Sequence, residues 1–458
     1  MDRTTLLRSL AKQLAPGELT FEADQLSAFS GDKWFAAHRP DAVALPQSVA
    51  SVSTVLAFAN EHRIPVTPRG AGYGYVGGCV PVQGGIVLSV HKLNQIVEIS
   101  KSDFVAVVQP GVITAQLQEA VEKQGLYYPP DPASRADCSI GGNIATNAGG
   151  PRCLKYGVTR DYVLGLEVVL PNGTVTRLGS RTHKNKTGFD LHRLFVGSEG
   201  MLGVVTEATL KLIPLPPYRA CYAIGFPEMA TAISALQAIF AAGFLPSALE
   251  LADGFTLAAA HKRTGAEWLS QCRALLIVEL DGHEGSVRQE LQLLKEVLAG
   301  FKSVFVQEGL GAEGCEEFWK LRREFSYALR DTGLKKLNED VVVPRGRLKD
   351  LFDMGARLQA EHGISVACFG HAGDGNIHVN LMLDDHDPAQ VEHSEEALDA
   401  LFRGVLELGG SITGEHGIGL AKKRWWPIAV SQEAQDLHRT IKQALDPHGI
   451  LNPGKFLG

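Results

Sequence analysis

The segment GHAGDGNIHVN, residues 370–380, constrains the fold more than any other part of the chain. The residues before it, ISVACFG, are apolar and rich in small or β-branched side chains, and NIHVNLML alternates polar and apolar positions, so both flanks are predicted to be strands. Ala-Gly-Asp-Gly favours a tight turn, which predicts a hairpin. Because side chains at i and i+2 of a strand share a face, the hairpin should gather His371, His378 and Asn380.

A second polar segment, SITGEHGIG at residues 411–419, places Glu415 and His416 between glycines. Two histidines and one carboxylate suit a divalent transition metal and leave coordination positions for substrate and water. We therefore predict a metal site formed by His371, His378 and Glu415. Nitrogen and oxygen ligands suit zinc, which we expect first, but also manganese, iron and cobalt. A structural role is the alternative for each histidine taken singly.

Length and composition indicate a globular protein with more than one core. A chain of 458 residues is too long for one ordinary core, so two or three domains are expected. The net charge of −7 provides no basic stripe, which argues against nucleic acid as a partner. No window of about 18 apolar residues predicts a membrane span, and the amphipathic N-terminal segment lacks the apolar core of a signal peptide. Seven cysteines without a CxxC pair indicate reduced thiols, a cytoplasmic protein and no iron–sulfur cluster in this chain.

Two glycine-rich stretches lie in the first half of the chain. RGAGYGYVGG, residues 69–78, superficially matches a dinucleotide fingerprint, but that fingerprint must open a helix. Here the stretch leads into GGIVLSV, a predicted strand, so a Rossmann fold is not expected. The second stretch, SIGGNIATNAGG at residues 139–150, is predicted to be a similar loop. Such loops can bind a pyrophosphate through bare amides, although each one alone is also consistent with a plain surface turn.

GHAGDGNIHVN, GEHGIG and the C-terminal LNPGK resemble the D-2-hydroxyacid dehydrogenases of the FAD-linked oxidase superfamily. This group includes glycolate oxidase, D-lactate dehydrogenase and D-2-hydroxyglutarate dehydrogenase, and the resemblance covers nearly the whole chain. It implies a PCMH-type flavin-binding domain. Members with covalently bound flavin typically have a histidine in the first glycine loop, where this chain has Tyr73 and Tyr75, so noncovalent FAD is expected.

The resemblance also implies which residues bind the cofactor. They lie in the two glycine stretches, between them, in the VGSEGMLGVV segment and in the C-terminal motif. These residues are Arg69, Gly70, Ala71, Gly72, Tyr73, Gly74, Pro130, Asp131, Ser134, Gly141, Gly142, Asn143, Thr146, Asn147, Glu199, Gly200, Val205 and Asn452.

The predicted fold class is α+β, with a two-lobed flavin-binding domain and a cap domain. LIPLPPYRA, residues 212–220, marks a boundary because proline interrupts regular structure. Beyond it, helical patterns alternate with strands such as RALLIVELDG, which indicates helices packed on an antiparallel sheet. We expect the flavin-binding domain at residues 1–215, the cap with the substrate and metal sites at 216–419, and a helical C-terminal segment, 420–458, that returns to the flavin-binding domain.

EEFWKLRREFSYALRD, residues 316–331, has the apolar spacing of a helix and places Arg322 and Ser326 one turn apart on another face. Solvated charge is one interpretation of that face. In the 2-hydroxyglutarate branch of the family, an arginine and a threonine at this spacing contact the second carboxylate of the substrate, together with a lysine six residues before a proline. Counting back from Pro344 gives Asn338, which favours the glycolate and lactate branch.

We expect FAD-dependent oxidation of a D-2-hydroxy acid of the glycolate or D-lactate class to the 2-oxo acid. Consecutive side chains diverge in an extended segment, so Glu415 should bind the metal while His416 acts as the base. Asn380 is expected to orient the substrate carboxylate, and Arg322 and Ser326 to bind the rest of the substrate. The alternatives are a D-2-hydroxyglutarate dehydrogenase, a metallohydrolase and a non-catalytic flavin-binding subunit.

The reduced flavin of such an enzyme needs an electron acceptor outside this chain. A quinone, an electron-transfer flavoprotein and an iron–sulfur subunit all remain open as acceptors. Association with a membrane through such a partner and formation of a homodimer are also left open.

Overall fold

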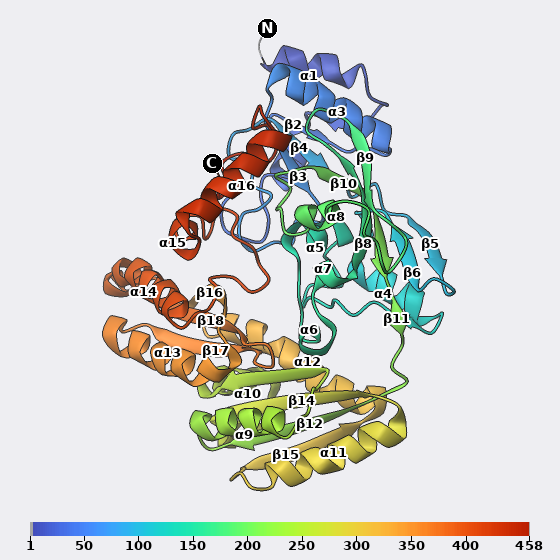
Figure 1. Ribbon diagram of the computed structural model, residues 1–458. Helices are drawn as coiled ribbons and strands as arrows, with labels where there is room; N and C mark the ends of the chain where they lie inside the picture. The colour runs from blue at the N-terminus through green and yellow to red at the C-terminus, as the bar shows by residue number, and fades with distance from the viewer. Residues whose placement is uncertain (1–2, 458) are drawn as a thin grey trace. The chain divides into compact units, whose positions relative to one another are not determined.

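A computed structural model describes residues 3–457 and divides them into two compact units. Unit 1 comprises residues up to Gly149, Val158–Leu215 and the segment from Glu415 onward; unit 2 comprises Gly150–Gly157 and Pro216–Gly414 (Figure 1). The second boundary therefore lies after Gly414 rather than after residue 419. The segment Gly150–Gly157, which we call the strap, was not expected from the sequence to belong to unit 2. Within residues 3–457, no helix has the length and apolar character needed to cross a membrane.

Unit 1 contains two main sheets. The first has the order β1 (Leu19–Thr20), β2 (Ala42–Ala44), β4 (Ile86–Ser89) and β3 (Val66–Arg69), with β2 and β3 parallel to β4. The second is antiparallel, with the order β5 (Ile96–Ser100), β6 (Val105–Val108), β10 (Val204–Lys211), β8 (Val163–Val169) and β9 (Val175–Gly179). A two-stranded ribbon is formed by β7 (Leu126–Tyr127) and β11 (Ile213–Pro214).

Helix α3 (Val49–His62) shows why the first sheet has a packed core. Ser48 caps its first turn by accepting a hydrogen bond from the Ser51 amide, and its buried face, which includes Val52, Val55 and Leu56, packs with the apolar side chains of β2 and β4. The other helices of unit 1 are α1 (Arg3–Ala11), α2 (Ala23–Ala28), α4 (Thr114–Glu122), α5 (Ile140–Thr146), α7 (Thr159–Tyr162), α8 (Leu191–Phe195), α15 (Trp426–Ala429) and α16 (Gln432–Leu445).

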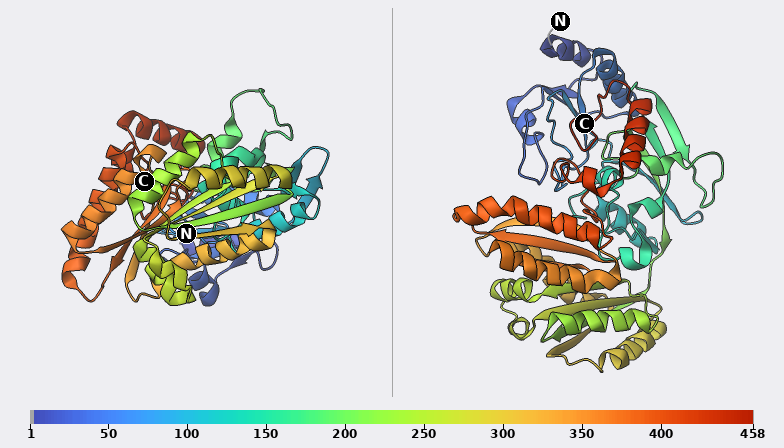
Figure 2. Two further views of the ribbon diagram at one scale, coloured as in Figure 1. Left: turned by 90° about the horizontal axis from the view of Figure 1, so that it is seen from below. Right: turned by 60° about the vertical axis from the view of Figure 1, so that its left-hand side comes forward.

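Unit 2 is built on one antiparallel sheet, as predicted. Its order is β15 (Phe305–Leu310), β12 (Tyr218–Phe226), β14 (Ala274–Gly282), β13 (Ala248–Asp253), β17 (Ser365–His371), β18 (Asn376–Leu383) and β16 (Lys335–Val342). Helices cover both faces of this sheet (Figure 2). The fold class expected from the sequence is confirmed by this architecture.

Alternate side chains of the strands point to opposite faces of the sheet. Cys221, Ala223, Leu275 and Ile277 pack with α10 (Gly254–Thr264) and α12 (Gly311–Arg330), while α9 (Met229–Ala241) and α11 (Glu284–Leu298) contact β12 and β14 from the opposite face. The remaining elements of unit 2 are α6 (Cys153–Tyr156), α13 (Leu348–His362), α14 (Pro388–Glu407) and two short 3-10 helices, Glu267–Gln271 and Arg345–Arg347.

The predicted hairpin is present as β17 and β18. Phe369 pairs with His378 and Ala367 pairs with Asn380, which puts the polar residues on the face covered by α12. Gly375 in the turn has φ of 87°, and a Cβ at this position would lie 2.0 Å from the carbonyl oxygen of Val343. The tight turn therefore requires glycine there.

One sequence-based expectation about the glycine stretches was wrong in part. The stretch from Ser139 to Gly150 is not a continuous loop, because Ile140–Thr146 forms helix α5. Ser139 caps this helix by accepting a hydrogen bond from the Gly142 amide, and Asn147 ends it in the left-handed conformation. Capping by serine outweighs the poor helix propensity of the two glycines.

Candidate functional site

The hairpin brings two predicted metal ligands and Asn380 together in unit 2. The rings of His371 and His378 have centroids 5.5 Å apart at 81°, and a ligand nitrogen of one lies within 4.8 Å of a ligand nitrogen of the other. The two side chains are largely buried, with 9% of His371 and 11% of His378 exposed. Two imidazoles at this separation can bind one divalent cation between them, so the residues present fit the expected metal.

Asn380 is fully buried and lies beside the histidines. Its Nδ2 donates to the carbonyl oxygens of Ala367 at 3.0 Å and His378 at 3.1 Å, while Oδ1 has no hydrogen-bond partner among the described residues. Both N–H bonds of the amide are therefore used. A substrate carboxylate would need a hydrogen-bond donor, but only the acceptor Oδ1 of Asn380 remains, so the arrangement differs from the expectation that Asn380 orients a carboxylate. Oδ1 suits a hydrogen-bond donor such as a hydroxyl.

Glu250, a buried carboxylate on β13, was not predicted from the sequence. Its Oε1 lies 2.6 Å from Nδ1 of His371, and its Oε2 accepts a hydrogen bond from Nε of Arg322 at 2.5 Å. Burial alone would raise the pKa of the Glu250 carboxyl, but Arg322 and His371 together lower that pKa to about 2. The alternative of a solvated charge on α12 does not hold for Arg322, whose side chain is 11% exposed.

A second buried carboxylate, Asp340 on β16, connects the hairpin to the segment that precedes Glu415. Asp340 accepts hydrogen bonds from Nδ2 of Asn376 at 2.6 Å, from the Gly414 amide at 2.8 Å and from the Thr413 hydroxyl at 3.2 Å. Its Oδ1 is also 4.0 Å from Nδ1 of His378. Unit 2 ends at Gly414, so the position of Gly414 is fixed next to the histidine face.

Ser326 and Lys336 meet on the same face of unit 2. Nζ of Lys336 donates to the Ser326 hydroxyl at 2.8 Å. Desolvation, with a smaller contribution from Arg330, lowers the pKa of Lys336 to about 8. The lysine beside Ser326 is thus Lys336, two residues before the position at which the family pattern was counted. Residues 336 and 338 share a face of β16, a periodicity of two that could have identified Lys336.

In unit 1, the first glycine loop packs against the start of α5. The Ala71 amide donates to the Ser139 hydroxyl at 3.1 Å, and a Cβ on Gly70 would lie 2.6 Å from that hydroxyl oxygen and 3.1 Å from the Gly142 amide nitrogen. The two stretches are therefore side by side, at a distance that only glycine permits at residue 70. The Ser139 hydroxyl accepts hydrogen bonds from the Ala71 and Gly142 amides in this structure, and the close approach of two glycine stretches is the arrangement in which the other backbone amides of the loops can bind a pyrophosphate.

Arg69, Glu199 and Asn452 hold these loops in place. The Arg69 guanidinium donates to the carbonyl oxygen of Gly31 and lies against Gly72. The Glu199 carboxylate accepts hydrogen bonds from the amides of Ile418 at 2.7 Å and Gly419 at 2.8 Å. Nδ2 of Asn452 donates to the Glu199 carbonyl oxygen at 2.7 Å and to that of Gly78 at 3.0 Å, so it joins the VGSEG turn to the first loop.

Several predicted cofactor residues have a left-handed backbone conformation. Of the five non-glycine residues with positive φ in the described part of the chain, three are predicted to bind FAD: Asn147, Glu199 and Asn452. Such conformations persist where the surrounding structure enforces them, and they cluster at ligand-binding sites. Asn147 adopts this conformation as the C-cap of α5, where asparagine is common, whereas Glu199 and Asn452 adopt it outside the helices and strands.

The other predicted cofactor residues occupy different parts of unit 1. Thr146 donates its hydroxyl to the Gly142 carbonyl oxygen at 3.3 Å, and Lys33 lies over the Tyr73 ring. Pro130, Asp131 and Ser134 follow β7, and Val205 lies on β10. Gly74, Gly141, Asn143 and Gly200 lie in or next to the segments already described.

His416, the predicted base, belongs to unit 1, whereas His371 and His378 belong to unit 2. Its ring lies 5.3 Å from that of Tyr75 in the first glycine loop. The Leu420 amide also donates to the Val76 carbonyl oxygen at 2.7 Å. The segment after His416 is thereby attached to the loop that is predicted to bind FAD.

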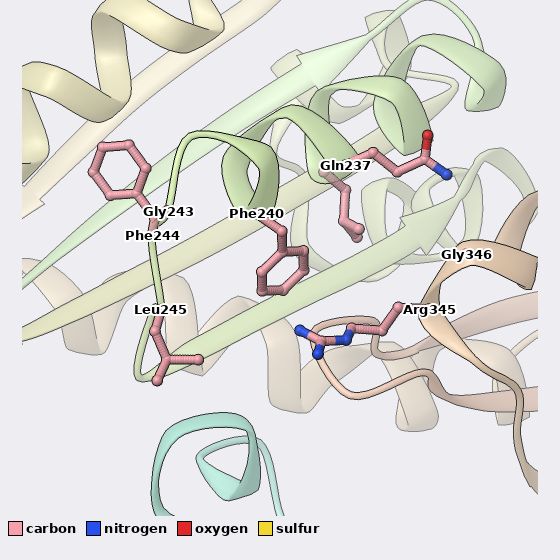
Figure 3. A pocket seen from close by; sticks show the side chains of 8 residues that line it. Gln237, Phe240, Gly243, Phe244, Leu245, Arg345 and Gly346 are labelled. Carbon is pink, nitrogen blue, oxygen red and sulfur yellow. The ribbon is translucent and has the colours of Figure 1, made fainter.

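An open pocket of about 450 Å³ lies elsewhere in unit 2 (Figure 3). The guanidinium of Arg345 lies over the Phe240 ring at 4.5 Å, and Leu245 forms another part of the wall. None of the residues that line this pocket belongs to the predicted site, so it does not contribute to the assignment.

The fold and these two sites define a member of the FAD-linked oxidase family. Residues 215–456 match the family of FAD linked oxidases, C-terminal domain, and residues 40–179 match the FAD binding domain family. The chain therefore belongs to the FAD-linked oxidases.

Individual proteins of this family are similar to the chain over most of its length. Glycolate oxidase subunit GlcD of Bacillus subtilis is 40% identical over 91% of this chain and 89% of its own length. D-lactate dehydrogenase of Anaerostipes hadrus is 34% identical over 97% of this chain and 96% of its own length. Among solved structures, p-cresol methylhydroxylase with bound substrate matches with a TM-score of 0.81 and 20% identity over 99% of this chain and 96% of that one, which shows a common fold.

Proposed function

We propose that this protein oxidises a D-2-hydroxy acid of the glycolate or D-lactate class to the corresponding 2-oxo acid. The observation that carries the proposal is the buried pair of His371 and His378 on one face of the hairpin, in a chain of the FAD-linked oxidase family. The names of the relatives, a glycolate oxidase component and a D-lactate dehydrogenase, agree with this substrate class. When bound, FAD would accept the electrons, and a divalent cation would favour the alkoxide of the substrate hydroxyl.

His371, His378 and Glu415 are the proposed ligands of the cation. Glu415 follows Gly414 directly, and the Gly414 amide is held by Asp340 in unit 2. One peptide bond therefore limits how far Glu415 can lie from the histidine face, because consecutive Cα atoms are about 3.8 Å apart. This covalent restraint supports Glu415 as the third ligand.

His416 is the proposed base for the substrate hydroxyl. It follows Glu415 immediately, so in an extended segment the two side chains diverge and can serve different roles. The contact of its ring with Tyr75 and the attachment of the following segment to Val76 support a fixed position beside the flavin loop. The Oδ1 of Asn380 would accept a hydrogen bond from a donor group of the substrate.

A D-2-hydroxyglutarate dehydrogenase is the second candidate, and the contact of Lys336 with Ser326 favours it. A cationic amine beside a hydroxyl suits a second carboxylate on the substrate. Glycolate and D-lactate lack that group, so a substrate panel separates the two candidates.

Anaerobic reduction of the bound flavin by a panel of D- and L-2-hydroxy acids tests the proposal. Bleaching by glycolate or D-lactate is expected, with D-2-hydroxyglutarate favoured if the second candidate is correct. No bleaching by any D-2-hydroxy acid would contradict both. A metallohydrolase would show no flavin spectrum, and a non-catalytic flavin-binding subunit would show the spectrum but no bleaching.

Variants of the two adjacent residues test the division of roles. His416→Ala should keep FAD and metal while slowing flavin reduction by about 10²- to 10⁴-fold, the usual contribution of a positioned base. Glu415→Ala should lose metal instead. The reverse pattern would show that the two roles are exchanged.

The electron acceptor of the reduced flavin is proposed to be outside this chain. The relative from Bacillus subtilis is named as a subunit, which agrees with electron transfer to a partner. A quinone, an electron-transfer flavoprotein and an iron–sulfur subunit can be compared directly by reoxidation of the reduced protein.

A further inference from the structure

Glu250 bridges two residues that were predicted from the sequence to belong to the site. It lies on β13 with 1% of its surface exposed, and its two carboxylate oxygens contact different partners, Nδ1 of His371 and Nε of Arg322. Such a carboxylate is costly to bury without charged partners. The bridge therefore links the hairpin, the neighbouring strand and helix α12.

The register of the sheet fixes this contact. Leu251 pairs with Gly370 and Ala252 with Phe369 in the antiparallel β13–β17 pair. The next pair in this register joins Glu250, the residue before Leu251, to His371, the residue after Gly370, so the two are cross-strand neighbours on one face. The Arg322 guanidinium approaches from α12 and lies 4.7 Å from the centre of the Phe369 ring, which holds it over the same face.

The contact between Glu250 and His371 determines which ring nitrogen of His371 carries the proton. An ionised carboxylate can only accept hydrogen bonds, so Nδ1 of His371 must be the donor. A neutral imidazole carries one N–H, and with its proton on Nδ1 the other nitrogen, Nε2, carries the lone pair through which a histidine binds a metal ion. Metal-binding histidines usually donate their second nitrogen to a carboxylate in this way, and the carboxylate fixes ring orientation and raises ligand basicity.

We propose that Glu250 is a positioning residue that holds His371 as the Nδ1–H tautomer, so that Nε2 faces the divalent cation, and that Arg322 holds Glu250. The inference rests on the proposed metal pair of His371 and His378. Arg322 then has a role in positioning Glu250 that does not require contact with the substrate, in addition to any role in substrate binding.

Metal affinity of the purified flavoprotein, measured with Co²⁺ in competition with a chelator, tests the proposal without a turnover assay. Glu250→Gln should weaken Co²⁺ binding by about 10- to 100-fold, the usual effect of removing such a carboxylate, with unchanged FAD content. Glu18→Gln is the control. Glu18 is also a buried carboxylate, but it accepts hydrogen bonds from the Gln47 amide and the Ser51 hydroxyl rather than from a histidine, so its variant should bind Co²⁺ as the unmodified protein does.

If His378→Ala binds Co²⁺ more weakly than the unmodified protein but Glu250→Gln binds it equally well, the proposed role of Glu250 is overturned. Unchanged affinity in His378→Ala would instead overturn the proposed metal pair, so the two failures are distinguishable. Equal weakening of Co²⁺ binding in Glu250→Gln and Glu18→Gln would show a general effect of lost buried charge and would also overturn the positioning role.

A measurement on the unmodified protein avoids dependence on variant stability. In the metal-free, ¹⁵N-histidine-labelled protein, the ring nitrogen shifts of His371, assigned by difference from His371→Gln, should show a protonated Nδ1 and an unprotonated Nε2. A protonated Nε2 with an unprotonated Nδ1 would refute the proposal.

Discussion

Replacement of Arg152 by methionine should destabilise unit 2 by about 3 kcal/mol. Arg152 belongs to the strap, and its Nε and Nη2 donate to the two carboxylate oxygens of Glu279 at 2.8 and 3.0 Å. The Glu279 side chain is 1% exposed and that of Arg152 is 14% exposed, so water screens the pair little. Loss of one partner from a buried pair typically costs about 3–5 kcal/mol because the other charge stays buried.

The remaining partners of Glu279 place the expected value at the lower end of that range. Nε1 of Trp319 still donates to the carboxylate at 2.6 Å, the Ser247 hydroxyl donates at 3.2 Å, and Arg219 lies 3.6 Å away. These groups stabilise the charge in part but do not replace the paired hydrogen bonds of Arg152. The strap should also open more readily, since the Arg152 side chain is one of its main attachments to the sheet.

Urea unfolding followed by tryptophan fluorescence measures the change in the free energy of unfolding, and trypsin cleavage after Lys155 reports opening of the strap. Arg177→Met is the control, because Arg177 pairs with Glu167 and Glu207 with 69% of its side chain exposed, and such pairs contribute about 0–1 kcal/mol. The double variant Arg152→Met with Glu279→Leu should recover much of the loss, since no charge is left buried. A loss for Arg152→Met no larger than that for Arg177→Met would refute the reasoning.

Three further predictions concern the cofactor, the metal and a half-buried lysine. Acid precipitation should release yellow FAD into the supernatant, because the first glycine loop has Tyr73 and Tyr75 where a covalent histidine would be expected; colour retained in the pellet would show a covalent bond. His378→Ala should lose metal and turnover but keep the flavin, because His378 and the glycine loops belong to different units; a metal-replete, active variant would exclude this ligand. Lys336→Met should be more stable than the unmodified protein at neutral pH, by up to about 3 kcal/mol, because desolvation lowers the pKa of Lys336 from 10.5 to about 8 in the folded state. Between pH 8 and 10.5 Lys336 is protonated in the unfolded chain but not in the folded one, so the stability of the unmodified protein rises with pH and the stability advantage of the variant should shrink. Urea unfolding at several pH values measures this advantage, and a constant value would contradict the linkage.

The sequence alone determined the elements whose information is local. The alternation of NIHVNLML and the glycine turn before it predicted the hairpin and its histidine face, because strand periodicity and turn chemistry depend on neighbouring residues. The apolar spacing of residues 316–331 likewise predicted the helix that carries Arg322 and Ser326. The extent of α5 was missed because the glycines around its serine cap favoured a loop.

Which distant residues meet these elements depends on the order of the strands and the packing of the helices in three dimensions. Glu250 and His371 are 121 residues apart, and their contact depends on β13 and β17 being neighbours in the sheet, which no local pattern encodes. The attachment of the strap could not be predicted from local patterns either, because the partner of Arg152 lies 127 residues further along the chain. Lys336 rather than residue 338 reaches Ser326 because the packing of α12 on β16 sets that distance. Buried charges find partners through the order and register of strands, and that order is a property of the whole sheet.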